Sequence, residues 1–274
     1  MLEPFSRFER RRRNQLAGGC ALDKIASLDL NPTLRKIVLK GGRRLIKQIQ
    51  KLMGRYSLVG DHKFFPTAQF PWVADLEANS SVIREELDDV LARRDDVPNY
   101  QDISPDQKHL AKGDNWKTFF FFAYGIAAPG NCQRCPRTAE LLKKVPGAKT
   151  AFFSILAPHS HIPPHCGPYK GVIRYHLGLM VPKPETSCRL RVEDSVRHWE
   201  EGKSLLFDDT FQHEVWNDSD QTRVVLFMDV VRPLPFPISL LNSLVIKSIA
   251  ASPFIRDAKK NHEDWERRMS ELWN

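Results

Sequence analysis

The feature that most constrains the fold of this chain is a succession of short apolar segments that begins at Ala148. Gly, Pro, Asp or Asn residues separate the segments at close spacing. They read TAFFSILAP, GVIRYHLGLMVP, SCRLRVED, KSLLFDD, HEVWND and TRVVLFMDVV. Short β-branched and aromatic runs bounded by turn residues are typical of strands, and several in a row indicate a barrel or sandwich. The sequence therefore predicts an all-β core at about residues 148–233.

Helical periodicity appears before this core. Apolar residues recur at helical spacing from Asp75 to Arg94. A short helix is predicted from Thr138 to Val145, since prolines flank it on both sides. Between them, the aromatic run WKTFFFFAY at 116–124 favours a buried strand. We expect a mainly β fold with flanking helices.

Three regions follow from these patterns. Residues 1–60 form a basic, partly helical N-terminal extension, of which 1–30 are polar and predicted to be poorly ordered. Residues 61–235 form the domain that contains the β core. Residues 236–274 form a C-terminal helical extension. Its first helix has an apolar face that consists of Ile238, Leu241, Leu244, Val245 and Ile249, and a charged helix is expected from 261 to 273.

The charge of the chain is concentrated at its N-terminus. The whole chain carries +8, whereas residues 1–56, with fourteen basic and four acidic side chains, carry +10. The remaining residues therefore sum to about −2 by the same count. This distribution indicates a polyanionic partner for the N-terminal segment. A phospholipid surface is favoured over nucleic acid.

A basic amphipathic helix is predicted from Leu34 to Met53, with Gly41-Gly42 expected to interrupt it. Its apolar face, with Leu45 and Ile49, either packs on the domain or lies in an anionic membrane through residues 34–55. No apolar run approaches the roughly 20 residues that span a bilayer, and the basic start lacks the hydrophobic region of a signal peptide. We expect a cytoplasmic protein with peripheral membrane contact as an option.

Two histidines are candidate metal ligands. His165 and His213 lie 48 positions apart, each in a turn-like segment beside a strand. Loops at one mouth of a barrel can bring two imidazoles to one ion, and two His with open positions suit Fe(II). Satisfied structural histidines are the alternative, and His161 is a rival to His165. Asp208 and Asp209 are expected in turn or capping roles, although either carboxylate can orient an imidazole.

An arginine indicates an anionic ligand beside this pair. Arg223 lies in the strand TRVVLFMDVV, among apolar neighbours, and a buried guanidinium needs an anion. Asp229 is the one nearby carboxylate. Arg174 and His176 alternate on another strand and so face one side of it. Together these groups predict a cavity that binds a dicarboxylate.

These residues carry a resemblance to a known family. FSILAP, HIPPHCGPYKGVIRYHLGL, WEEGKSLLFDDTFQHEVWND and TRVVLFMDV, with WKTFFFF upstream, resemble the aspartyl/asparaginyl β-hydroxylases over roughly residues 65–235. The resemblance implies a double-stranded β-helix (cupin or jelly-roll) core. It also implies an oxygenase that uses Fe(II), 2-oxoglutarate and O2 to hydroxylate an unactivated C–H by ferryl-mediated hydrogen abstraction and hydroxyl return.

The resemblance assigns iron to His165 and His213. It assigns the distal carboxylate of 2-oxoglutarate to Arg223 and Ser154. For Ser154, a strand hydroxyl bonded to nearby backbone is a nearly equal alternative.

Four further residues complete the implied pocket. Arg174 and His176 would contact the carboxylate nearer the metal. Trp116 and Val215 would line the co-substrate pocket, with a plain core role as the alternative.

Gly167 departs from a common pattern. Many 2-oxoglutarate oxygenases have Asp or Glu two residues after the first histidine, where this chain has Gly167. Relatives that hydroxylate Asp or Asn share the glycine and use two His with water, whereas lipid A hydroxylases tend to have Asp. The glycine therefore favours a peptide substrate, while the basic N-terminal and apolar C-terminal helices favour a lipid acyl chain. Both substrates stay open.

Two other interpretations remain. Cys132 and Cys135 form a CxxC that represents half of a zinc site, a redox pair or ordinary loop cysteines. The competing function is a non-catalytic cupin-like binding module at a membrane surface, against which the two histidines and Arg223 argue.

Overall fold

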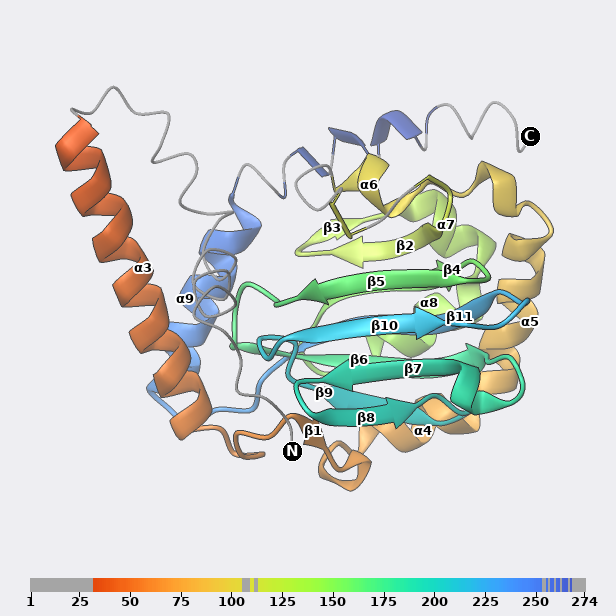
Figure 1. Cartoon of the computed structure of the whole chain (residues 1–274), viewed down its shortest axis with the longest axis horizontal. Coiled ribbons are helices and arrows are strands. Elements are labelled where there is room, and N and C mark those ends of the chain that lie inside the picture. The colour runs from red at the N-terminus through yellow and green to blue at the C-terminus, as the bar shows by residue number, and fades with distance from the viewer. Residues whose placement is uncertain are drawn as a thin grey trace, which may run out of the picture.

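Two antiparallel sheets face each other in the computed structural model, which describes residues 32–104, 109–110, 113–252 and scattered positions from 255 to 267, with side chains from residue 44 onward (Figure 1). The larger sheet contains, in spatial order, β1 (Phe64–Phe65), β9 (Ser204–Phe207), β6 (Val172–Met180), β11 (Arg223–Val231), β4 (Ala148–Leu156), β2 (Trp116–Ala123) and β3 (Ile126–Ala127). The smaller sheet contains β5 (Ser160–His165), β10 (His213–Asn217), β7 (Cys188–Val192) and β8 (Ser195–His198).

The strands from β4 to β11 follow a jelly-roll path. The chain passes from the larger to the smaller sheet after β4, β6 and β9, and returns after β5, β8 and β10. Such repeated crossing between two facing sheets is the double-stranded β-helix topology. The predicted mainly β fold with flanking helices is therefore confirmed.

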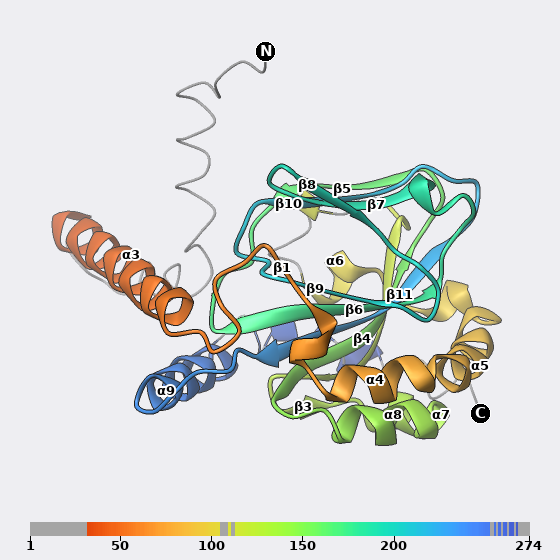
Figure 2. The same cartoon turned by 90° about the horizontal axis from the view of Figure 1, so that it is seen from below.

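Helices flank the two sheets on several sides. They are α3 (Pro32–Arg55), α4 (Trp72–Ala78), α5 (Ser80–Leu91), α6 (Tyr100–Ile103), α7 (Pro129–Arg134), α8 (Pro136–Lys143) and α9 (Ile238–Ala250). Figure 2 shows the smaller sheet, the larger sheet, and a layer containing α4, α5, α7 and α8 stacked in that order, with α3 and α9 beside the barrel.

Strand alternation separates the two faces of the larger sheet. On β6, Ile173, Tyr175 and Leu177 belong to the apolar core beneath the helices. Arg174 and His176 therefore point the other way, into the space between the sheets. That interior is where the candidate site lies.

Several elements differ from the sequence predictions. The predicted 75–94 helix is two helices, α4 and α5, separated at Asn79. The glycines at 41 and 42 do not interrupt α3, because a glycine in a helix costs about 1 kcal/mol without blocking its hydrogen bonds. The HIPPH segment forms strand β5 rather than a loop.

The predictions for residues 1–30 and most of those for 261–273 lie outside the described residues. On α9, Leu244 is 54% exposed, so it does not belong to the packed face with Leu241 and Val245. Leu45 on α3 is likewise exposed, at 61%. Across the described part of the chain, no helix is both long and apolar enough to span a bilayer.

Candidate active site

The two predicted metal ligands are direct partners across the smaller sheet. His165 at the end of β5 pairs with His213 at the start of β10, and their ring centroids are 4.1 Å apart. Both histidines therefore lie on strands, not in the loops that the sequence indicated.

Each imidazole has one nitrogen already engaged. Nδ1 of His165 lies 2.8 Å from the Pro163 carbonyl oxygen, and Nδ1 of His213 lies 3.0 Å from that of Phe211. A carbonyl oxygen only accepts, so Nδ1 donates in both rings and Nε2 keeps its lone pair. Burial lowers the pKa of His165 to about 4 and that of His213 well below its ordinary value. Both rings are therefore neutral at pH 7 and suited to bind a metal.

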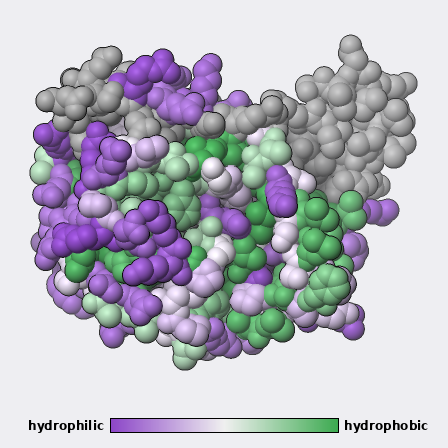
Figure 3. All heavy atoms as spheres, turned by 180° about the vertical axis from the view of Figure 1, so that it is seen from behind, coloured by the Kyte–Doolittle hydropathy of each residue, from purple (hydrophilic) through white to green (hydrophobic). Residues whose placement is uncertain are grey.

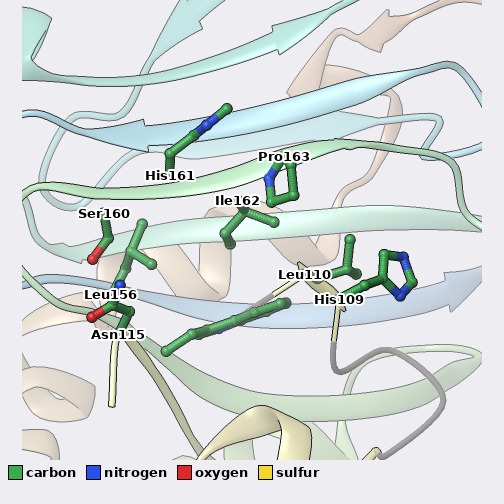
Figure 4. Close-up of a pocket in the computed structure, with 9 residues that line it drawn as sticks. His109, Leu110, Asn115, Leu156, Ser160, His161, Ile162 and Pro163 are labelled. Carbon is green, nitrogen blue, oxygen red and sulfur yellow. The ribbon is translucent and has the colours of Figure 1, made fainter. Parts of the chain in front are cut away.

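A β-bulge aims His165 into the barrel. His165 pairs with His213 and Ile162 pairs with Val215, so β5 has one more residue than β10 across this interval. His161, on the regular part of β5, donates from Nε2 to Glu214 at 2.8 Å and stacks on Trp216. His161 and Ile162 point to opposite sides of the strand (Figure 4). His161 is therefore not the partner of His213.

The space beside Gly167 is filled by a carboxylate from another strand connection. A Cβ on Gly167 would lie 1.9 Å from Oδ2 of Asp209. Asp209 is 1% exposed and forms an ion pair with Arg174 at 2.9 Å, which differs from the expected turn role. Burial raises the pKa of Asp209 to about 7, while Arg174 opposes the shift.

Asp208 has the expected turn role and also forms buried ion pairs. Its Oδ1 accepts from the backbone N–H of Thr210 at 3.0 Å. Its Oδ2 forms buried ion pairs with Lys170 at 2.6 Å and Arg232 at 2.5 Å. This carboxylate thus holds the β9–β10 connection that carries Asp209.

Arg174 faces the interior as predicted, but two carboxylates already balance its charge. Besides Asp209, its Nε donates to Asp229 at 3.0 Å, and its guanidinium carbon lies 4.4 Å from the Phe227 ring centre. Asp229 is therefore the partner of Arg174 rather than of Arg223.

Arg223 is a buried cation that lacks a hydrogen-bonding anion within the described residues. It is 1% exposed, and its Nε and Nη1 have no partner there. Both ring nitrogens of His176 and the indole nitrogen of Trp199 are also unsatisfied. Burial lowers the pKa of Arg223 to about 10, which still leaves it charged at neutral pH. Unpaired buried donors around a cation are the signature of a missing anion.

The other predicted pocket residues also lie between the sheets. Ser154 faces Val225 on the neighbouring strand and accepts a hydrogen bond from Trp116 Nε1 at 3.0 Å, so its partner is a side chain and not backbone. Val215 is buried in the same apolar cluster as Trp116. A cavity of about 330 Å³ lies on this side of the barrel, lined by Trp116, Leu156 and Ile162 among others (Figure 4).

Comparison with known proteins agrees with this geometry. Residues 77–233, more than half of the chain, match the aspartyl/asparaginyl β-hydroxylase family. The chain belongs to this family. Within it, the chain is 42% identical over 225 residues to an ornithine lipid ester-linked acyl 2-hydroxylase of Rhizobium tropici, covering 82% of this chain and 80% of that protein.

Other relatives are less fully covered. The aspartyl/asparaginyl β-hydroxylase of Homo sapiens is 36% identical over 166 residues, which are 59% of this chain and 21% of the human protein. The aspartate β-hydroxylase domain-containing protein 2 of Mus musculus is 38% identical over 127 residues, 43% of this chain and 36% of that protein. The matched segment thus spans about a fifth of the length of the human β-hydroxylase.

The two neutral imidazoles are suited to share one metal ion. Among the described residues, no three His, Cys, Asp or Glu side chains converge as a metal cluster, so the paired imidazoles provide the candidate ligands. Cys132 and Cys135 form no disulfide bond, and burial raises the pKa of Cys135 to about 12. A thiol with so high a pKa is poorly suited to redox chemistry at neutral pH.

Sequence reasoning missed two contributors to this site. Trp199 stacks under the Arg223 guanidinium at 4.5 Å, but it belongs to the WEEGK turn segment and had no periodic signal. The contact between Asp209 and Gly167 joins residues 42 positions apart in the sequence. The glycine was the available signal, since a missing side chain often marks the close approach of another group.

Proposed function

We propose that this protein is an Fe(II)- and 2-oxoglutarate-dependent hydroxylase that acts on an acyl chain of a membrane lipid. The observation that carries the proposal is the unpaired, buried Arg223 in the same barrel interior as the neutral His165–His213 pair. A dicarboxylate would satisfy both groups, with one end at the metal and the other on the guanidinium.

The residues take separate roles in this proposal. Nε2 atoms of His165 and His213 hold the iron, which with 2-oxoglutarate and O2 supplies the oxidising chemistry for an unactivated C–H. Arg223 binds the distal carboxylate through its free donors, while His176 contacts the co-substrate beside the metal. Asp209 fills the space beside Gly167, two residues after His165, and pairs with Arg174.

A lipid substrate is favoured by the extent of the similarity. The alignment with the Rhizobium tropici acyl 2-hydroxylase is longer than the matched family segment, so the likeness extends into the flanking regions. A peptide Asp or Asn is the second candidate, because the human relative is named for those residues and Gly167 is consistent with them.

Membrane contact forms part of the proposal. On α3, basic and apolar side chains are both exposed; examples are Arg44, Lys51 and Leu45. Exposed apolar residues in and near α9 include Phe236, at 81%, Leu240, at 53%, and Leu244, at 54%. Apolar residues gather on the side of the molecule where α9 lies (Figure 3). A basic and apolar surface of this kind suits an anionic bilayer.

The test compares His213→Ala with the matched control His161→Ala. Succinate formation from 2-oxoglutarate is measured with Fe(II) and ascorbate, alone and with lipid vesicles or an Asp- or Asn-containing peptide. Mutating an outer residue that orients a metal ligand costs about 10- to 100-fold in activity. We expect the loss of a ligand in His213→Ala to reduce turnover by more than this, and His161→Ala to keep its rate.

Mass spectrometry identifies the substrate class, because hydroxylation increases the mass of the lipid or the peptide by one oxygen atom. An increase on the peptide alone would show that the substrate is a peptide and not a lipid. If the wild-type protein shows neither 2-oxoglutarate turnover nor iron-dependent 2-oxoglutarate binding, the non-catalytic binding module is the correct interpretation.

A further inference from the structure

An aromatic cavity of about 150 Å³ opens on the side of the barrel next to β2 and β3. Its walls include Phe120 and Phe122 from β2, Phe152 from β4 and Phe227 from β11, and Tyr100 and Tyr124 also contribute. Phe152 stacks on Phe227 at 4.1 Å and lies 4.7 Å from Phe120. The rings thus form a continuous apolar wall on the inner face of the larger sheet.

The inner end of this cavity adjoins the candidate metal site. Arg174 lines the cavity, and its guanidinium also contacts Asp209, the residue packed on Gly167. Pro168, which follows Gly167, is another lining residue. The Arg174–Asp209 pair therefore lies between the cavity and the segment at Gly167, two residues after His165.

The lining favours an apolar ligand over a peptide. Its two charged residues, Arg174 and Asp229, pair with each other, so the cavity presents no unbalanced charge of its own. Apart from the Ser104 and Thr150 hydroxyls, the remaining lining is mainly aromatic and aliphatic. A peptide segment would bring one backbone N–H and one C=O per residue, more than these two hydroxyls can pair, whereas a hydrocarbon chain needs no such partners. An apolar cavity of about 150 Å³ is large enough to bind a six-carbon ring.

The wall of the cavity is also tied to the two helices assigned to the membrane surface. Gln50 of α3 donates to the Pro168 carbonyl at 2.9 Å, and Asn242 of α9 donates to that of Gly171 at 2.9 Å. Tyr124 lines the cavity and packs in the apolar cluster of α3 and α9. A lipid bound at those helices would therefore meet the cavity along the loop that carries Gly167.

We propose that this aromatic cavity is the binding subsite for the acyl chain of the substrate and holds the carbons next to the hydroxylated position. This inference rests on the proposed function for the identity of the substrate. The residues that carry it are separate from His165, His213 and Arg223, so it can be tested without iron or 2-oxoglutarate.

The probe is cis-parinaric acid, a polyene fatty acid whose fluorescence rises in an apolar site, titrated into the full-length protein. Ala127→Phe adds a ring at the rim of the cavity, and Ala74→Phe on the exposed side of α4 is its control. We expect saturable binding to the wild type, binding weakened by about 10-fold in Ala127→Phe as expected for overfilling a site, and wild-type binding in Ala74→Phe.

A second variant, Phe122→Ala, enlarges the cavity instead of filling it. In competition with cis-parinaric acid, the saturated fatty acid that binds this variant best should therefore have a longer chain than the one that binds the wild type best. Absence of saturable binding to the wild type, equal binding by Ala127→Phe, or displacement by an Asp-containing peptide but not by fatty acids would overturn the inference. Chain binding without 2-oxoglutarate turnover would instead contradict the proposed function and leave the subsite in place.

Discussion

At the scale of single residues, the site is defined by what its side chains lack. Arg223 and His176 are buried without hydrogen-bond partners in the described structure, whereas Arg174 is held by Asp209 and Asp229. A buried cation without an anion costs several kcal/mol in a folded protein. Under the proposed function, Arg223 binds the co-substrate, whereas the charge of Arg174 is balanced by carboxylates of the protein.

Arg223→Met tests this distinction. Charge-assisted hydrogen bonds contribute about 1.5–3 kcal/mol each, so we expect the KM for 2-oxoglutarate to rise about 10- to 100-fold. Thermal stability without ligand should be retained or rise, because methionine removes an uncompensated buried charge. Steady-state succinate formation and thermal melting measure the two effects.

Arg189→Met is the matched control, since Arg189 forms an ion pair with Asp218 and contacts Trp216. Its KM should stay at the wild-type value. An unchanged KM in Arg223→Met as well would show that the guanidinium does not bind the co-substrate.

At the scale of elements, a buried carboxylate joins α5 to α8. Glu86, 4% exposed, accepts from the backbone N–H of Thr138 at 2.8 Å and of Arg137 at 2.9 Å. These are N–H groups of the first turn of α8, which have no partner within the helix. Burial by itself raises the pKa of Glu86, but hydrogen bonds from Thr138 and Arg137 outweigh it and lower the pKa below its ordinary value.

Glu86→Gln should reduce the free energy of unfolding by about 1–3 kcal/mol at pH 7. The pKa of Glu86 is lower in the folded state, so its stabilisation is present above the ordinary pKa of about 4.3 and is lost as pH falls through the folded value. The difference in the free energy of unfolding between the variant and the wild type should therefore become smaller at acid pH. Urea unfolding at pH 7 and at lower pH measures this dependence.

Glu85→Gln provides the comparison on the same helix. Glu85 forms an exposed ion pair with Arg137, in which its side chain is 66% exposed, and such pairs contribute at most about 1 kcal/mol. A loss in Glu85→Gln as large as that in Glu86→Gln, or a constant Glu86→Gln deficit at every pH, would contradict the role of the buried carboxylate.

At the scale of the whole molecule, α3 and α9 lie together beside the barrel and connect to the loop at Gly167. This arrangement places the basic and apolar surface next to the site. We expect Phe236→Ser combined with Leu240→Ser to weaken binding to phosphatidylglycerol vesicles by about 10-fold or more, because each apolar side chain buried contributes about 1.5–3 kcal/mol. Sedimentation of the full-length protein at two salt concentrations measures binding.

Val196→Ser is the control, because Val196 is a 40% exposed apolar residue on β8 of the smaller sheet. Binding to neutral phosphatidylcholine vesicles should be weak, and added salt should weaken binding to anionic vesicles. Salt-independent binding, or equal binding by the double variant, would remove α9 and the basic helix as the contact surface.

The sequence by itself determined the β core, its flanking helices and the grouping of Arg174 with His176, because alternation and turn residues are local properties of the chain. It also indicated His165, His213 and Arg223 as a set. The comparisons show the family of the chain. The roles of these three residues in iron and 2-oxoglutarate binding remain predictions.

Only the tertiary structure decided which histidine faces inward and which charges are balanced. The bulge in β5 separates His165 from His161, and it depends on pairing with β10, not on the HIPPH sequence alone. Likewise, Asp229 joins Arg174 because β11 and β6 are neighbours in register. Asp209 fills the space at Gly167 because two connections distant in the sequence meet in the fold. Such long-range contacts have no local pattern, so they follow from strand pairing and from packing between the sheets.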